Sequence, residues 1–227
     1  MATITRYSVI EDMLTYGHIL VAGSAGSGKS TLMDLFIYSA CFLPNEPAIY
    51  LVDPKKVDLW KYRNMKNVVR YVDEPGDAVA MFRKLIDTME KRFDTIRSKN
   101  QTMTDEQRIY IFIDEVADLV DEHKEVVPLI KRLVRLGRAA GIIVVMATQT
   151  LLADILETSI TSNITCRVAL KTATSAQSRC IVGVSGAERL PQHGYGIIAK
   201  GSEIKTYELP KVPDADLKAV IEYKERR

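Results

Sequence analysis

The chain has 227 residues, of which 47% are hydrophobic, enough to bury the core of one α/β domain. Its net charge of only +2 excludes a protein whose whole surface attracts nucleic acid. The three cysteines and three histidines lack the spacing of metal ligands, so we expect reduced, mostly buried thiols. No apolar run approaches the ~20 residues of a membrane span, so we expect a cytoplasmic chain without a membrane segment.

The first predicted elements flank a glycine-rich loop. Residues 19–22 form a short apolar run typical of a buried strand, and residues 29–43 carry a helical pattern that ends at a Pro-Asn-Glu-Pro turn. Between them, residues 23–30 read Gly-Ser-Ala-Gly-Ser-Gly-Lys-Ser, the strand–GxxxxGK[ST]–helix pattern of a phosphate-binding loop. Glycines let bare backbone N–H groups approach crowded phosphate oxygens, and the helix N-terminus adds positive partial charge. The segment therefore predicts that the chain binds a nucleoside triphosphate.

Two residues of this phosphate-binding loop have defined chemistry. Lys29 can reach the β- and γ-phosphates, and the hydroxyl group of Ser30 can hold Mg²⁺. The alternative, a glycine-rich turn with a chance lysine, leaves the flanking strand and helix unexplained. The predicted nucleotide-binding set is Gly23, Ser24, Ala25, Gly26, Ser27, Gly28, Lys29, Ser30 and Thr31.

Strand and helix patterns alternate along the rest of the chain. We expect strands at residues 48–52, 67–72, 109–113, 142–147 and 168–170, helices at 75–99, 123–139, 175–181 and 213–225, and a hairpin of strands 195–200 and 203–208. The strand at 109–113 has no polar side, which indicates a sheet covered on both faces. The alternation predicts an α/β fold with a doubly wound, mostly parallel sheet and helices on both faces.

Two acids follow the apolar strand at residues 109–113. Asp114 is expected at the carboxyl edge of the sheet beside the phosphate-binding loop, where it would orient Mg²⁺. Glu115 comes next, and a carboxylate there can position and polarise an attacking water molecule. The alternatives are a helix N-cap for Asp114 and a solvated first-turn acid for Glu115.

A polar strand end and a basic helix end supply two further candidates. Gln149 follows the strand at 142–147, where its amide can sense the γ-phosphate; an ordinary polar strand end is the alternative. Arg138 lies among small residues just before that strand. We expect its guanidinium group to reach the nucleotide of a neighbouring subunit and stabilise transition-state charge. Lys131 and Arg132, by contrast, fit a solvated helix face.

Several motifs occur in a fixed order around these residues. They are residues 18–23 leading into the phosphate-binding loop, 52–55 (Val-Asp-Pro-Lys), 89–93 (Met-Glu-Lys-Arg-Phe), 114–119 (Asp-Glu-Val-Ala-Asp-Leu), 138–142 (Arg-Ala-Ala-Gly-Ile), 147–149 (Ala-Thr-Gln), 178–179 (Ser-Arg) and 186–188 (Gly-Ala-Glu). In this order the chain resembles, over about residues 18–208, the motor domain of the FtsK/SpoIIIE family of DNA translocases. The phosphate-binding loop alone is generic, whereas the other motifs in one order are specific.

The resemblance implies a RecA-like core and a homohexameric ring that hydrolyses ATP, with Mg²⁺, to move double-stranded DNA. It assigns ATP hydrolysis to Lys29, Glu115 and a trans-acting Arg138. Arg179 keeps the family pattern and is the best candidate for a DNA contact, with a helix salt bridge as its alternative; Lys171 is a weaker candidate. The implied division is an N-terminal lead-in (1–17), the RecA-like ATPase motor domain (18–212) and a C-terminal helix (213–227).

The chain departs from the family pattern where DNA contacts are expected. Thr150, Thr161 and the region of Ser175 replace basic residues that are usual in the family, and residues 150–165 contain no lysine or arginine. This leaves open an ATPase of a secretion or conjugation machine that moves protein or a mobile element's DNA, and a nucleotide-gated adaptor that moves nothing. The family's membrane segments, linker and winged-helix domain are not seen, so we expect an excised motor domain or a compact relative from a phage or mobile element.

Overall fold

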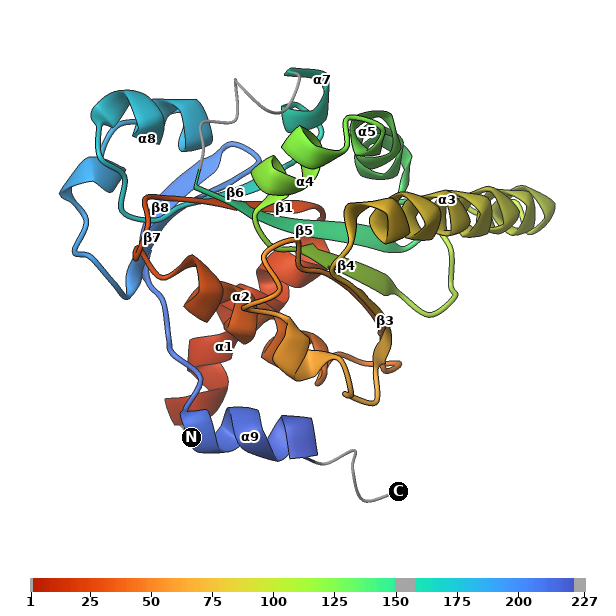
Figure 1. Cartoon of the computed structure of the whole chain (residues 1–227), viewed down its shortest axis with the longest axis horizontal. Helices are drawn as coiled ribbons and strands as arrows, with labels where there is room; N and C mark the ends of the chain where they lie inside the picture. The colour runs from red at the N-terminus through yellow and green to blue at the C-terminus, as the bar shows by residue number, and fades with distance from the viewer. Residues whose placement is uncertain (1, 150–157, 223–227) are drawn as a thin grey trace.

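The computed structural model describes residues 2–149 and 158–222, which form a mixed sheet between two layers of helices (Figure 1). Within these residues the sheet has eight strands in the order β3-β2-β4-β5-β1-β6-β7-β8. The strands are β1 (Ile19–Ala22), β2 (Ala48–Val52), β3 (Val68–Val72), β4 (Ile109–Ile113), β5 (Ile142–Thr148), β6 (Cys166–Ala169), β7 (Tyr195–Lys200) and β8 (Glu203–Glu208). The helices are α1 (Ala2–Tyr16), α2 (Lys29–Ala40), α3 (Pro75–Ser98), α4 (Val116–Glu122), α5 (Val126–Leu136), α7 (Thr158–Thr161), α8 (Ser175–Val182) and α9 (Asp214–Glu222), with short 3₁₀ turns η1 (Trp60–Tyr62) and η2 (Ala187–Arg189).

Helices cover both faces of the sheet, as the sequence predicts. Helices α3, α4, α5 and α7 lie on one face, and α1, α2 and α9 lie on the other (Figure 1). In β4, Ile111 and Ile113 pack in the first layer, whereas Tyr110 and Phe112 pack in the second. Alternate side chains of a strand point to opposite faces, so a strand that is buried on both faces is apolar throughout.

The parallel strands direct the candidate site residues to one edge of the sheet. Strand β1 lies between β5 and β6, with Ala22 opposite both Thr148 and Ala169, and β4 lies between β2 and β5. All of these pairs are parallel, and only β6-β7 and β7-β8 are antiparallel among the described strand pairs. The loops that follow β1, β2, β4 and β5 therefore converge where these strands end, which we call the carboxyl edge. The amino edge is the opposite one, where the same strands begin.

Residues 2–16, which the sequence analysis treats only as a lead-in, form helix α1. Ile10, Met13 and Leu14 are buried in the same core layer as α2. Their spacing of three and four residues places them on one face of the helix, but polar residues around them dilute the periodicity. Whether residues 1–17 and 213–227 are units separate from 18–212 stays a prediction.

The helix predicted at residues 123–139 is confirmed as α5, within three residues of each predicted end. A further helix that was not predicted, α4, precedes it, and the two are separated at His123, whose backbone is extended (φ −142°, ψ 91°). Pro128 explains the division, because proline lacks the N–H group that a helix interior needs and is tolerated only in the first turn. It lies in the first turn of α5, so a helix arriving from residue 116 cannot continue through it.

The other predicted strands and helices are confirmed within two or three residues of their ends, including the hairpin of β7 and β8. Helix α9 is described to Glu222, so residues 223–225 of the predicted helix lie outside the described residues. The expectation of mostly buried cysteines is wrong: Cys166 is buried, Cys41 is half-buried and Cys180 is exposed, and all three are reduced. Among the described helices, none combines the length and apolar character that a bilayer span requires.

Candidate nucleotide-binding site

The phosphate-binding loop joins β1 to α2 at the carboxyl edge, as predicted. Gly26 and Gly28 have positive φ angles of 68° and 98°, a conformation that favours glycine. Gly23 is required for space, because a Cβ atom there would lie 2.7 Å from Ser27 Oγ and 2.9 Å from Leu170 Cβ. Ala25 and Gly26 are exposed at the tip of the loop. The loop is therefore shaped by its glycines and open where a ligand would approach.

Lys29, the first residue of α2, folds back onto this loop. Its Nζ atom donates hydrogen bonds of 2.9 Å to the carbonyl oxygens of Gly23 and Ser24. The side chain is buried, and burial lowers its pKa although Glu115 and Asp114 oppose that shift. An ammonium group has three N–H donors, so one remains for a phosphate oxygen.

Asp114 occupies the end of β4 and is buried beside other acids. Burial, followed by the charges of Asp58 and Asp53, raises the pKa of Asp114 to about 7. A buried carboxylate in such surroundings favours a cation, and carboxylate and hydroxyl oxygens are donors that suit Mg²⁺. No group of three acids, histidines or cysteines among the described residues could hold a metal ion by itself. Mg²⁺ usually binds one or two carboxylates together with substrate phosphates, so Asp114 could contribute to such a site.

Glu115 is held by the end of β5. Its Oε1 atom accepts hydrogen bonds of 2.9 Å from Thr148 Oγ1 and from the backbone N–H of Gln149. The side chain is only 4% exposed, so the alternative of a solvated first-turn acid is wrong. Its backbone is left-handed (φ 43°, ψ 69°), a conformation uncommon for a residue other than glycine that recurs at functional sites. Glu115 also takes the N-cap position of α4, which the sequence offered to Asp114.

The segment after β2 contributes two residues that the sequence analysis missed. Asp58 Oδ2 accepts a hydrogen bond of 3.1 Å from Ser30 Oγ. Lys55 Nζ lies 3.7 Å from Glu115 Oε2 and 3.3 Å from Asp118 Oδ2, and these acids outweigh the effect of burial and raise its pKa. Lys55 belongs to the Val-Asp-Pro-Lys motif, which was a usable signal. Asp58 lies in an irregular turn with no motif of its own.

Residues 2–105 match the model of the FtsK/SpoIIIE family. The chain is 30% identical over 97% of its length to the DNA translocase FtsK of Chlorobaculum tepidum, and 35% identical over 76% of its length to that of Staphylococcus aureus strain Mu50. The chain belongs to the FtsK/SpoIIIE family. It spans 31% and 25%, respectively, of the lengths of these two relatives.

Solved structures share the fold of this FtsK/SpoIIIE chain. The pCW3 conjugation coupling protein TcpA, solved with ATPγS, aligns with a TM-score of 0.79 at 23% identity, over 93% of this chain and 66% of that one. ATPases 2 and 3 of EssC from Geobacillus thermodenitrificans align with a TM-score of 0.80 at 20% identity, over 94% of this chain and 44% of that one. The predicted RecA-like P-loop fold is thereby confirmed.

The FtsK/SpoIIIE chain also brings Gln149 and Thr31 next to the loop. Gln149 lines a small pocket together with Gly23 and Ser24. Thr31 lines a larger cavity of about 310 Å³, together with Ser27, Gly28, Leu32, Leu170, His193, Gly194, Leu209, Pro210 and Lys211. Gln192 Nε2 donates a hydrogen bond of 3.1 Å to the carbonyl oxygen of Gly26, so the turn before β7 also contacts the loop.

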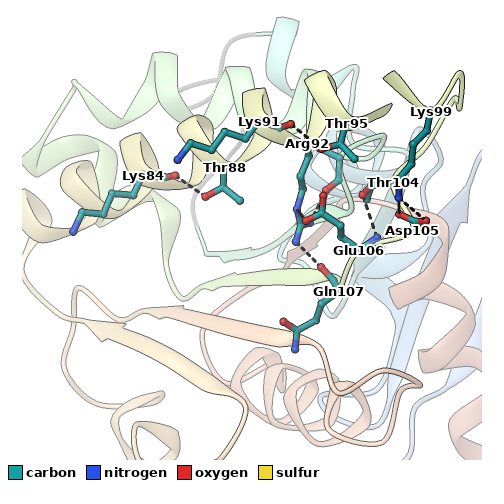
Figure 2. Close-up of polar contacts among 11 residues, drawn as sticks. Lys84, Thr88, Lys91, Arg92, Thr95, Lys99, Thr104, Asp105, Glu106 and Gln107 are labelled. Atoms are coloured by element: carbon teal, nitrogen blue, oxygen red, sulfur yellow. Dashed lines mark hydrogen bonds and ion pairs between the residues drawn. The ribbon is translucent and has the colours of Figure 1, made fainter. Parts of the chain in front are cut away.

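Arg138 is not part of this cluster. It lies in the turn between α5 and β5, at the amino edge, where it is exposed and its guanidinium carbon is 5.7 Å from the centre of the Tyr16 ring. Figure 2 shows Arg92 of α3, which fixes this turn, next to Glu106 and Gln107. Arg92 donates hydrogen bonds of 2.7 Å to the carbonyl oxygens of Ala140 and Gln107, and its Nε lies 3.3 Å from Glu106 Oε2. Its own position therefore gives Arg138 no role at the nucleotide site of the same subunit.

The two candidate DNA contacts differ in the structure. Arg179 is exposed on α8. The pKa of Glu188 is lowered mainly by backbone hydrogen bonds, and the charge of Arg179 makes a smaller contribution. Lys171 Nζ donates to the carbonyl oxygens of Glu188 (3.0 Å) and Leu190 (2.7 Å), so its ammonium group holds the turn before β7. Both DNA contacts stay predictions. The stretch at 150–165, which contains no lysine or arginine, lies partly outside the described residues, which omit 150–157.

Proposed function

We propose that this chain binds ATP with Mg²⁺ and hydrolyses it as one subunit of a homohexameric ring that moves double-stranded DNA. The observation that carries the proposal is Glu115, a buried carboxylate held by Thr148 and Gln149 at the same sheet edge as the phosphate-binding loop. Relatives that the chain matches over most of its length are named DNA translocase FtsK, which supports DNA as the substrate.

The side chains divide the work of hydrolysis. The loop N–H groups and Lys29 would bind the β- and γ-phosphates, while Ser30 and Asp114 would hold Mg²⁺. When bound, Mg²⁺ supplies charge neutralisation for the phosphate oxygens. Glu115 would orient a water molecule in line with the γ-phosphate and accept its proton. The hydrogen bonds from Thr148 and Gln149 fix the carboxylate, so its direction is set before the nucleotide arrives.

The position of Arg138 supports a role in trans. Its own nucleotide site is at the carboxyl edge, whereas Arg138 is exposed at the amino edge. A head-to-tail contact between copies places different surfaces of the two subunits together, and it forms a ring when the rotation between neighbouring subunits closes. Arg138 of one subunit would then stabilise transition-state charge at the nucleotide of the next. Six subunits facing one pore would also add their modest charges into a strong field on DNA phosphates.

A second candidate function is an ATPase of a secretion or conjugation machine that moves protein or a mobile element's DNA. The observation that favours it is the scarcity of free cations where DNA contacts were expected. Residues 150–165 contain no lysine or arginine, and the ammonium group of Lys171 is bound to backbone carbonyls. Among the proteins of similar fold, TcpA is named a conjugation coupling protein.

Steady-state ATP hydrolysis with increasing duplex DNA at low salt tests the proposal. We expect DNA to raise the turnover rate, and added salt to reverse that increase because phosphate contacts release counterions. The Lys29→Ala variant measures contaminating ATPase activity. Turnover that ignores DNA at low salt would contradict DNA translocation and favour the secretion candidate, while no turnover above the Lys29→Ala level would contradict ATP hydrolysis itself.

A further inference from the structure

The segment between β2 and η1 is fixed against the phosphate-binding loop and its helix. Asp53 Oδ2 accepts a hydrogen bond of 2.9 Å from the backbone N–H of Leu59, whose side chain is buried. Tyr62 donates a 2.6 Å hydrogen bond from its hydroxyl group to Asp34 of α2. Asp58 lies in the sequence between Asp53 and Tyr62, whose hydrogen bonds fix the segment. Its contact with Ser30 is therefore held in place by packing, unlike a pairing of two flexible side chains on the surface.

The Ser30 hydroxyl group can donate a hydrogen bond to Asp58 and bind a cation at the same time. A hydroxyl group has one proton to donate and two lone pairs to offer. Ser30 Oγ lies 3.1 Å from Asp58 Oδ2, where it donates its proton, and its lone pairs remain available to a cation. Partners of this kind orient a metal ligand and increase its basicity. Asp114 has no comparable hydrogen bond with Ser30 among the described contacts.

Asp58 also belongs to the electrostatics of the site. After burial, its negative charge is the strongest cause that raises the pKa of Asp114, and it also acts on Lys29. Three different parts of the chain thus place Ser30, Asp58 and Asp114 around one region: the start of α2, the segment after β2 and the end of β4.

We propose that Asp58 is a third residue of the Mg²⁺ site, a positioning residue that accepts the Ser30 proton and adds a negative charge next to the cation. This inference rests on the proposed ATP site. It predicts opposite effects of Asp58 on nucleotide affinity in the absence and in the presence of Mg²⁺. A carboxylate beside the triphosphate repels the nucleotide when Mg²⁺ is absent and attracts the Mg²⁺–nucleotide complex when the ion is present. A residue with a structural role alone would not produce both effects.

The experiment measures binding of a fluorescent, non-hydrolysable ATP analogue to the whole chain, first in EDTA and then over a Mg²⁺ titration. We expect Asp58→Asn to raise the Mg²⁺ concentration for half-maximal binding by about tenfold, the lower end of the effect seen for such partners. In EDTA the same variant should bind the analogue at least as tightly as the unchanged chain. Asp58→Glu, which keeps a charged proton acceptor, should recover part of the Mg²⁺ response.

Two variants complete the experiment. Ser30→Ala should raise the Mg²⁺ requirement by as much as Asp58→Asn or more. Glu74→Gln is the matched control, because Glu74 pairs with Lys56 of the same segment but is exposed and makes no described contact with Ser30. If Ser30→Ala raises the Mg²⁺ requirement and Asp58→Asn does not, the inference is wrong while the proposed function stands. If the unchanged chain binds no analogue at any Mg²⁺ concentration, both are wrong. Thermal unfolding of each variant shows that the fold is kept.

Discussion

The two edges of the parallel sheet differ in how much of a site each one completes. At the carboxyl edge, Lys29 comes from the phosphate-binding loop, and Asp114 and Glu115 come from the end of β4. Lys29 and Glu115 hydrogen-bond to the backbone, and the charges of both acids act on the pKa of Lys29. At the amino edge, Arg138 is exposed beside a cavity of about 560 Å³ whose lining includes Thr104, Glu106 and Arg108. The first edge holds the proposed nucleotide site, and the second exposes the arginine that we propose to act on the nucleotide of a neighbouring copy.

The largest expected effect comes from Lys29→Ala, which should remove detectable ATP hydrolysis and weaken nucleotide binding. The loop would lose the ammonium group that its own carbonyls hold in place. Binding of a labelled ATP analogue, together with release of phosphate, checks this expectation. A variant that still turned over ATP would show that the carboxyl edge is not the nucleotide site.

Arg138→Ala should leave nucleotide affinity nearly unchanged and reduce turnover by roughly 10³-fold or more, the range found for arginine residues that act in trans. Mixing this variant with Lys29→Ala subunits should restore part of the activity. In the mixture, an intact Arg138 can face an intact nucleotide site. A mixture as inactive as its two components would mean that Arg138 acts within its own subunit or only supports the fold.

Glu115→Gln should retain ATP binding and lower hydrolysis by roughly 10²–10⁴-fold, because an amide cannot accept the proton of the attacking water. The amide oxygen can still accept the hydrogen bonds from Thr148 and Gln149, so the fold of the site should persist. Single-turnover phosphate release measures the chemical step. Unchanged hydrolysis would make Glu115 a structural acid whose only task is to join β4 to β5.

The smallest expected effect concerns His18, which precedes β1 at the amino edge. Burial, with help from the charge of Arg138, lowers its pKa from 6.5 to about 4. Between these pH values His18 is protonated in the unfolded chain but not in the folded chain. The free energy of unfolding therefore falls as pH drops from 6.5 to 4, by up to about 3 kcal/mol.

Urea unfolding at several pH values, compared between the unchanged chain and His18→Asn, measures this loss. Asparagine can still accept the hydrogen bond that the Val144 N–H donates to His18 Nδ1 at 3.0 Å, but it does not titrate. The comparison between the two chains is needed because the raised pKa of Asp114 acts in the opposite direction as pH falls. Identical slopes would show that His18 is not the group that titrates.

The sequence predicts the carboxyl edge well because its chemistry is local. A turn of glycines, a lysine at the start of a helix and acids at the end of an apolar strand each follow from a few consecutive residues. The sheet edge then brings them together automatically, since parallel strands end on one side. Asp58, by contrast, could not be predicted from a local pattern. It reaches Ser30 only through the packing of Leu59 and Tyr62, which no short pattern encodes.

The amino edge is harder to read for the same reason. The sequence identifies Arg92 only as one residue of a family motif. In the structure it is a buried cation that joins α3 to the turn of Arg138 through Ala140, and to the loop before β4 through Gln107. Helix α1 was missed because its apolar face consists of a few residues within a polar segment, and its burial depends on α2. Contacts between elements far apart in sequence decide both cases.

Strand β8 has one further consequence for assembly. It is the last strand of the sheet on its side, pairs with β7 alone among the described strands, and is mostly exposed. Glu203 and Lys205 form an ion pair on it, and Glu208 adds another charge. Charged edges of this kind discourage another chain from adding a strand. An oligomer of this protein should therefore not extend its sheet through β8, and a contact on that side of the sheet should be made by side chains and loops.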